Sequence, residues 1–493
     1  MNNKIDIVNR ISIGIDTASD EKNENLLNKF IEEINIFLSS SDFDSSLKQI
    51  LYYDLGNAYS SLDSLKNRNE NNVWNYNNIE HLNAIKAYRN CVKIETKNYP
   101  NKNDILVQCY TNLGNMFSES GRIIYAISAW KKALSINSAF GMAQGNLGRG
   151  LVEYAKNLYD DGQAFLIAKY AYECLKKSII SNDVYPSAKN YFEFYKQFLV
   201  QSIGTENLEA KKDIKDYFSS LTSEEKNYRL WVLSKSLFLN PLNDIYYDSY
   251  VAHDIIHLPN MIASINEPPK YHGLFNEIKQ QYVSARYFYY LYLQKKDTFE
   301  KHFSDKENLL VNTLDYSLYG IEHELLKTSY KSLYSILDKI AFFINDYFKL
   351  NKELKTVSFN TIWYDKKTID KKVEGLKNNT LKGLYYLSKD FHSYDMEYLE
   401  VSDDDAKNLA ELRNCLEHRY VKITQFENSP GISFQYDSLA YQITENDFEK
   451  KTEKMLFYVR EAIIYLSLAV HINERLNQPT DGKIIPIIMG ATL

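Results

Sequence analysis

The sequence predicts an all-α protein with two helical parts. Two observations predict this class. Small and large apolar residues recur at a period of 34 residues in the N-terminal part, and long segments rich in Leu, Glu and Lys with few breakers fill the C-terminal part. At 493 residues the chain suits two or three domains, and its 44% hydrophobic content supports packed cores. We expect an N-terminal segment, helical repeats, a connector, a helical bundle and a tail, at residues 1–21, 22–204, 205–270, 271–476 and 477–493.

Charge and cysteine usage exclude several classes of protein. The net charge is −6, so the protein as a whole has no positive charge that would attract nucleic acid. Any contact with RNA must therefore be made by a local basic patch. The N-terminus lacks the apolar core of a signal peptide, and no uncharged apolar run approaches the length of a membrane span. We therefore expect a cytoplasmic protein without membrane contact. The four cysteines are scattered, which argues against a zinc ribbon and a disulfide framework.

The N-terminal repeats consist of paired helices. Leu147-Gly148 follows Leu113-Gly114 by 34 residues, and an earlier copy begins at Leu55-Gly56. The clearest copy continues with Phe117, Gly121, Ala126, Trp130 and Ala133. This pattern resembles tetratricopeptide (TPR) repeats, which stack into a solenoid whose concave face commonly binds a peptide or a folded partner. A protein or peptide ligand is therefore expected; a purely structural helical arm is the alternative.

The connector has a different character because prolines interrupt any long helix. Within it, His253 and His257 have the spacing of a zinc site, and Asp254 lies where a metalloprotease would carry its catalytic Glu. Asp is one methylene shorter than Glu, Pro259 follows almost at once, and no third ligand is apparent. We interpret the pair as ordinary histidines and expect neither a metal nor a cofactor.

The C-terminal part reads as five helical segments. Their expected ranges are Phe275–Lys295, Asp315–Leu350, Asn379–Phe391, Ser402–Val421 and Asp447–Leu476. Ser402 is a good N-cap, and the three aspartates after it favour a helix start there.

The fourth segment contains the most informative stretch of the chain, Arg413-Asn414-Cys415-Leu416-Glu417-His418. An arginine keeps its charge and can bind two phosphate oxygens, while histidine exchanges protons near neutral pH. Helical spacing places Leu409, Leu412 and Leu416 on the core face and Asn414 with His418 on the opposite face. Arg413 and His418 project about 140° apart, so one isolated helix cannot aim both at one phosphate.

The motif resembles the Arg-polar-x-x-x-His signature of HEPN-domain proteins, many of which are ribonucleases. The stretches Gln281–Tyr287 and Asn240–Asp244 strengthen this resemblance, which points to TPR-fused HEPN proteins as a group. It implies a metal-independent endoribonuclease with a composite site in a homodimer or larger oligomer. Such fusions are expected to act as toxins or in antiviral defence by cleaving tRNA or mRNA.

The resemblance implies roles for the motif residues. His418 would activate the ribose 2′-hydroxyl or protonate the leaving oxygen, Arg413 would stabilise the transition state, and Asn414 would orient His418 or the phosphate. Glu417 is expected to tether Arg413 through an i,i+4 pair. Tyr420 occupies the position of a tyrosine that is adenylylated in related toxins, but its helical phase favours packing in the core.

A basic, aromatic segment lies between the second and third predicted helices of the bundle. It could grip an RNA backbone through Trp363, Lys366, Lys367, Lys371 and Lys372, although a solvated insert is the commoner meaning of such a run.

The sequence leaves two other functions open. One is a non-catalytic interaction protein whose bundle only dimerises or binds RNA. The weaker one is a metalloenzyme that uses His253 and His257.

Overall fold

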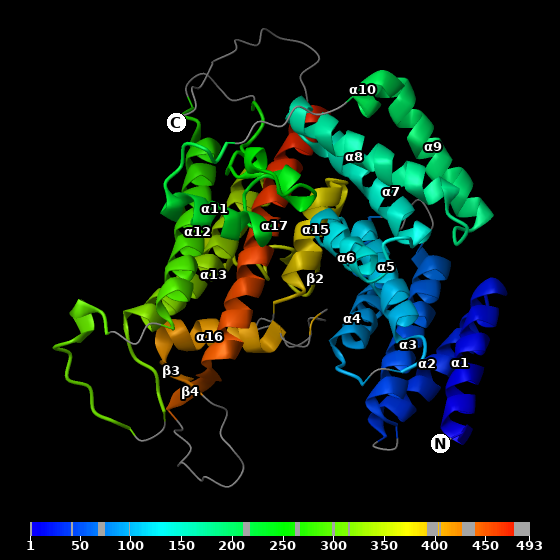
Figure 1. Ribbon diagram of the computed structural model, residues 1–493, viewed down its shortest axis with the longest axis horizontal. Coiled ribbons are helices and arrows are strands. Elements are labelled where there is room, and N and C mark those ends of the chain that lie inside the picture. The colour runs from blue at the N-terminus through cyan, green and yellow to red at the C-terminus, as the bar shows by residue number, and fades with distance from the viewer. Residues whose placement is uncertain are drawn as a thin grey trace.

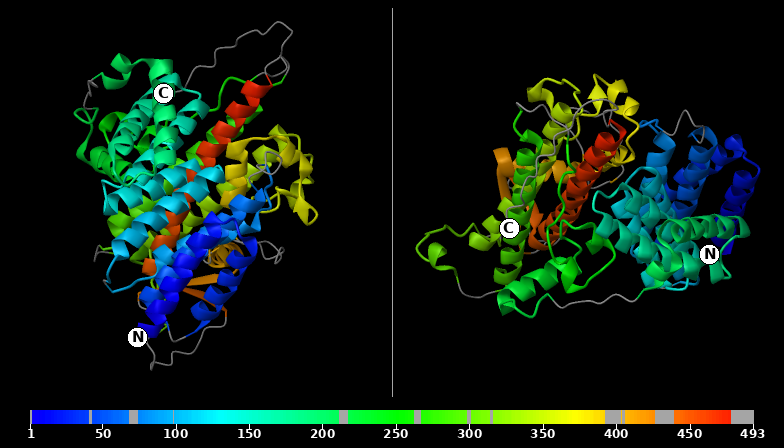
Figure 2. Two further views of the ribbon diagram at one scale, coloured as in Figure 1. Left: turned by 90° about the vertical axis from the view of Figure 1, so that its right-hand side faces the viewer. Right: turned by 90° about the horizontal axis from the view of Figure 1, so that it is seen from above.

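The computed structural model describes residues 2–40, 43–67, 74–97, 99–210, 217–261, 267–297, 301–313, 316–391, 403, 406–425 and 439–477. In these residues the chain forms seventeen α-helices and only four short strands, so the predicted all-α class is confirmed. Two helical parts lie side by side, and the long helix α17 runs between them (Figures 1 and 2).

The N-terminal part is a row of antiparallel helix pairs, here called the solenoid. It contains α1 (Asn2–Asp20), α2 (Glu24–Ser39), α3 (Ser45–Asn67), α4 (Ile79–Lys93), α5 (Lys102–Glu119), α6 (Ile123–Ile136), α7 (Gly141–Asn157), α8 (Asp161–Ile180), α9 (Pro186–Ile203) and α10 (Thr205–Glu209). Helices α3 and α4, α5 and α6, and α7 and α8 pair, and successive pairs stack on each other. The predicted N-terminal segment forms helix α1, which packs on α2 and α3.

The pairs are held close by glycines that face large side chains. Gly56, Gly114 and Gly148 lie directly against the side chains of Tyr88, Trp130 and Leu175, where an added Cβ would collide. Each of these glycines belongs to a Leu-Gly of the sequence repeat. The repeat pattern therefore records where the two helices of a pair approach each other.

The connector contacts both the solenoid and the bundle. It contains α11 (Ser223–Ser234) and the 3-10 turns η1 (Pro241–Asp244) and η2 (Ser249–Val251). Asp244 is buried and accepts hydrogen bonds from Arg460 at 2.6 Å and from Tyr154 at 3.1 Å. This one carboxylate therefore joins α17 to α7 across the connector.

The C-terminal bundle follows with α12 to α17. Its elements are α12 (Lys270–Lys295), η3 (Phe303–Asp305), α13 (Ile321–Tyr347), η4 (Leu354–Thr356), β1 (Tyr364–Asp365), β2 (Thr368–Ile369), α14 (Lys371–Gly375), α15 (Asn379–Ser388), α16 (Ala406–His418), β3 (Tyr420–Thr424), β4 (Ala440–Thr444) and α17 (Glu445–Leu476). Helix α17 is long and apolar enough to span a membrane, but 89% of its apolar window is buried inside the protein. It is the central helix of the bundle.

The fourth predicted helix, Ser402–Val421, is wrong at its C-terminal end. The helix stops at His418, and residues 420–424 form β3, which pairs in parallel with β4. On its other side, β3 accepts a hydrogen bond at Ile423 O from Leu318 N–H, at 2.8 Å. Leu318 belongs to the helix predicted from Asp315, but the observed helix α13 begins only at Ile321. Long-range pairing thus replaces the last helical turn. The predicted cap Ser402 lies outside the described residues.

The solenoid and the bundle approach each other backbone to backbone at Gly121 and Gly383. Gly121 precedes α6 with φ +81°, and a Cβ there would collide with the carbonyl oxygen of Asn379. Gly383 on α15 faces the carbonyl oxygen of Gly121 in turn. Only glycine satisfies both the left-handed backbone and this contact.

The Gly121→Ala variant is expected to lose about 2–4 kcal/mol of unfolding free energy, because left-handed strain adds to a clash with rigid backbone. Urea titration followed by tryptophan fluorescence measures the loss. Gly273→Ala on α12 is the control, since an added Cβ there meets open space. Equal unfolding free energies for wild type and Gly121→Ala would contradict the close approach.

Candidate functional site

Helix α16 is fixed in the bundle by its apolar face. Leu409 and Leu412 are fully buried as predicted, while Cys415 takes the third core position and Leu416 is half-buried. Tyr330 on α13 donates a hydrogen bond to the carbonyl oxygen of Leu409 at 2.9 Å. The opposite face of the helix is therefore left for the polar residues of the motif.

Arg413 is held over a ring on α13. Its guanidinium carbon lies 5.5 Å from the centroid of Tyr334, and Nη2 lies 3.8 Å from a carboxylate oxygen of Asp338. Nη1 donates to Asn414 Oδ1 at 3.1 Å, so in this structure Asn414 orients Arg413 rather than His418. The side chain of Arg413 stays 34% exposed, which leaves part of its fork open to an anion.

The carboxylate beside Arg413 is itself unusual. Burial raises the pKa of Asp338, although the Phe359 N–H and the charge of Arg413 oppose this shift. Asp338 thus provides a partly buried counter-charge that orients the arginine.

The predicted tether between Arg413 and Glu417 is wrong. Glu417 instead lies 3.9 Å from the ammonium of Lys331 on α13, while Arg413 pairs with Asp338. The partners on the neighbouring helix replace the i,i+4 pair within α16. An exposed ion pair contributes little to stability, so Arg413 gains little by pairing with Glu417 rather than with Asp338.

His418 is the last residue of α16, and its imidazole is exposed. Within the described part of the chain it has no hydrogen bond or ion pair, and so none with Arg413. Both ring nitrogens are therefore open to a ligand. The structure places the two key motif residues on one helix without bringing their side chains together.

Tyr420 does not pack in the core, contrary to the expectation from helical phase. It begins β3, is 37% exposed, and its hydroxyl lies 3.1 Å from the hydroxyl of Tyr319. The prediction failed because the helix ends before Tyr420. The residue is therefore partly exposed, two positions beyond His418.

The basic segment divides into a buried and an exposed part. Trp363 is fully buried and donates to the carbonyl oxygen of Phe359, so the prediction that it contacts RNA is wrong. Lys366 and Lys367 lie exposed at the turn between β1 and β2, and Lys371 and Lys372 lie exposed at the start of α14. The indole of Trp363 packs in the core against the rings of Tyr385 and Phe359.

Several residues near the motif were missed from the sequence. Lys331, Tyr334 and Asp338 lie along one face of α13 at spacings of three and four residues, next to α16. That spacing is a visible signal of a shared helix face. The sequence does not show, however, that this face of α13 packs against α16.

The histidines of the connector do not lie on the helix that the alternative metal site would need. His253 and His257 lie outside regular helices, and His257 Nδ1 contacts the carbonyl oxygen of Leu258 at 2.8 Å. The i,i+4 geometry that would bring two histidines to one metal is therefore missing.

The solenoid carries an open groove of about 510 Å³ between α3, α4, α5 and α6. Its lining is mixed: apolar side chains lie beside polar and charged ones, namely Val92, Ile94, Leu106, Tyr110 and Ile136 beside Gln49, Glu95, Thr96, Lys102, Lys132 and Ser135. Such a mixed lining suits a ligand that offers both apolar and polar groups, as a peptide does.

Residues 262–473 match the family model described as LA2681-like HEPN. The chain has a C-terminal HEPN domain. The motif helix and the face of α13 that holds Arg413 both lie inside the matched range. HEPN domains are generally ribonucleases, so the match indicates a nuclease or RNA-related role. The solenoid lies outside the matched range, and its assignment to the TPR family stays a prediction. Neither a curated protein nor a solved structure matches the chain.

Proposed function

We propose that this protein is an endoribonuclease that cleaves RNA through attack of the ribose 2′-hydroxyl. One observation carries the proposal: the HEPN domain holds a fixed, half-exposed Arg413 and, on the same helix, an exposed His418 that has no hydrogen-bond partner among the described residues. An oriented cation and a proton-transferring imidazole are the two groups that this reaction requires. RNA supplies its own nucleophile, so the protein has to provide only proton transfer and charge stabilisation.

Each motif residue has a task in this reaction. His418 takes the proton of the 2′-hydroxyl or gives one to the leaving 5′-oxygen. Arg413, oriented by Asn414 and Asp338, stabilises the charge on the pentacoordinate phosphate. The products are a 2′,3′-cyclic phosphate and a free 5′-hydroxyl.

The site is proposed to be composite, with two copies of the chain facing each other. Arg413 turns toward α13 while His418 ends the helix in solvent, so a second motif helix is the simplest way to bring an arginine and a histidine to one phosphate. A homodimer is the smallest assembly that provides this arrangement. The exposed lysines of the β1–β2 turn and α14 are the proposed contacts to the backbone of tRNA or mRNA.

The solenoid is proposed to bind a protein or peptide in the groove between α3 and α6 and to regulate cleavage. Toxin activity or antiviral defence in the cytoplasm would use such a sensor and effector. The alternative function is a non-catalytic protein whose HEPN domain only dimerises or binds RNA; the exposed lysines suit that reading equally well.

Purified protein in excess EDTA, incubated with tRNA and mRNA pools, tests the proposal. New cyclic-phosphate 3′ ends, mapped by sequencing, are expected with RNA. They should be absent with a 2′-O-methyl substrate of the same sequence, because that substrate lacks the nucleophile. Binding without cleavage of either substrate would favour the non-catalytic alternative.

A further inference from the structure

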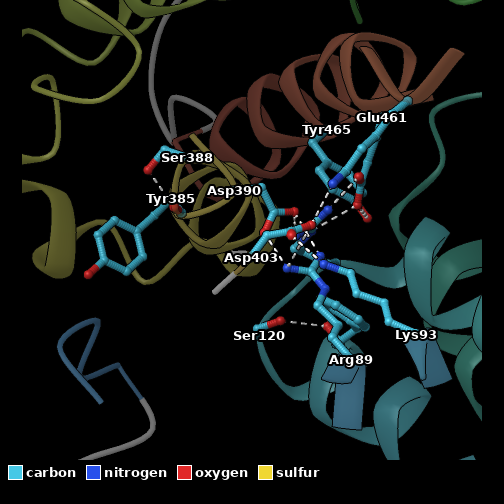
Figure 3. Close-up of polar contacts among 12 residues, drawn as sticks. Arg89, Lys93, Ser120, Tyr385, Ser388, Asp390, Asp403, Glu461 and Tyr465 are labelled. Atoms are coloured by element: carbon cyan, nitrogen blue, oxygen red, sulfur yellow. Dashed lines mark hydrogen bonds and ion pairs between the residues drawn. The ribbon is translucent and has the colours of Figure 1, made fainter. Parts of the chain in front are cut away.

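A buried network of charged side chains joins the solenoid to the HEPN domain (Figure 3). Arg122, just before α6, donates to Asp390 at 2.7 Å and to Glu461 on α17 at 2.8 and 3.1 Å. Arg89 on α4 donates to the same Asp390 at 2.9 Å. All four side chains are buried.

The network reaches the start of the motif helix through Asp403. This carboxylate is 3% exposed and accepts hydrogen bonds from Lys93 on α4 at 2.7 Å and from Lys454 on α17 at 2.6 Å. Arg89 lies 4.0 Å away. The backbone carbonyl of Asp403 accepts a hydrogen bond from the N–H of Ala406, the first residue of α16, at 3.0 Å.

One helix of the solenoid therefore holds both ends of the chain segment that enters the motif helix. Asp390 stands just beyond α15 and Asp403 just ahead of α16, and Arg89 contacts both. Burial raises the pKa of Asp403, but the charges of Arg89, Lys454 and Lys93 outweigh burial and keep the pKa well below its usual range. The group thus stays a carboxylate and depends on its cations.

We propose that Asp403 is a positioning residue for α16 and that Lys93 couples this position to the solenoid. A buried carboxylate that loses a cation is costly, so the start of α16 shifts toward water when Lys93 moves. Arg413 and His418 shift with the helix that carries them. Lys93 is the most exposed member of the network, with a side chain 42% exposed against 25% for Lys454. This inference rests on the proposed ribonuclease function.

The expected loss follows from the precision that catalysis requires. A misplacement of about 1 Å reduces turnover by ~10²-fold, whereas it changes substrate affinity far less. Two variants remove the coupling with little change of shape: Lys93→Met keeps the stem of the side chain, and Asp403→Asn keeps its size. Lys97→Met is the matched control. Lys97 is an exposed lysine four residues after Lys93, and it makes no ion pair with the described residues.

The test combines cleavage kinetics with amide hydrogen exchange of the full-length protein. Lys93→Met and Asp403→Asn are expected to lower kcat by ~10–100-fold with KM nearly unchanged, and to speed exchange in the first turn of α16. Exchange in α13 should stay unchanged, which a general loss of stability would not allow. Lys97→Met should match wild type in both measurements.

The inference would be overturned if the Lys93→Met and Asp403→Asn proteins fold and their α16 amides exchange as slowly as those of the wild type. The proposed function fails differently, since it fails when wild type does not cleave RNA. In that case the exchange rates of α16 still decide whether Asp403 and Lys93 position the helix.

Discussion

Replacing His418 by Ala is expected to reduce RNA cleavage by ~10²–10⁴-fold, the usual contribution of a positioned proton-transfer group. The side chain is exposed at the end of α16 and has no partner in the described part of the chain, so its loss should leave folding intact. Formation of cyclic-phosphate ends measures cleavage, and thermal unfolding checks the fold.

Two variants separate this chemical role from a change of surface charge. Arg413→Ala should reduce cleavage to a similar extent, because the cation beside Asp338 is removed. Arg419→Ala removes a neighbouring exposed arginine and should retain cleavage. If His418→Ala and wild type cleave equally fast, the motif is not the active site. Mixing the His418→Ala and Arg413→Ala proteins should restore part of the activity if the site is composite.

Replacing Arg122 by Met is expected to lower the free energy of unfolding by about 3–5 kcal/mol, the cost of breaking a buried ion pair from one side. Asp390 and Glu461 would then lie buried without this guanidinium between them. The charges of Arg89 and Arg122 outweigh burial and hold the pKa of Asp390 well below its usual range, so the charged form is the one that is stabilised. Urea titration at neutral pH measures the loss.

Arg10→Met is the control, since its ion pair with Glu33 is solvent-exposed and should contribute at most about 1 kcal/mol. Adding Glu461→Gln to Arg122→Met should recover part of the loss, because one uncompensated charge disappears. Similar losses for Arg10→Met and Arg122→Met would show that the network is not a buried connection between the two parts.

The sequence predicted most of the helical architecture because its signals are local. Leu-Gly pairs 34 residues apart marked the close approach of paired helices, and the observed contacts of Gly114 and Gly148 explain that spacing. The third predicted bundle helix, Asn379–Phe391, was right in position, although it ends at Ser388. Helix propensity and apolar periodicity act within a few residues, so they can be read without knowing the neighbours.

Errors occurred where a distant segment decided the structure. Residues after His418 pair with residues 440–444 as a strand, and this pairing exposes Tyr420. Trp363 belongs to a basic run but packs in the core against Tyr385, which lies 22 positions later on α15. The expected partner of Arg413 was four residues away, whereas its actual partner is 75 positions earlier on another helix.

The sequence by itself determined the helical class, the repeat spacing, the motif and the angular separation of Arg413 from His418. Those properties follow from residue spacing on a single helix. Only the tertiary structure decided which residues hold the motif: Asp338 beside Arg413, and Asp403 clamped by Lys93 and Lys454. Such pairs join helices that are far apart in the sequence, so only the packing of those helices brings the charges within the few ångströms over which they interact strongly.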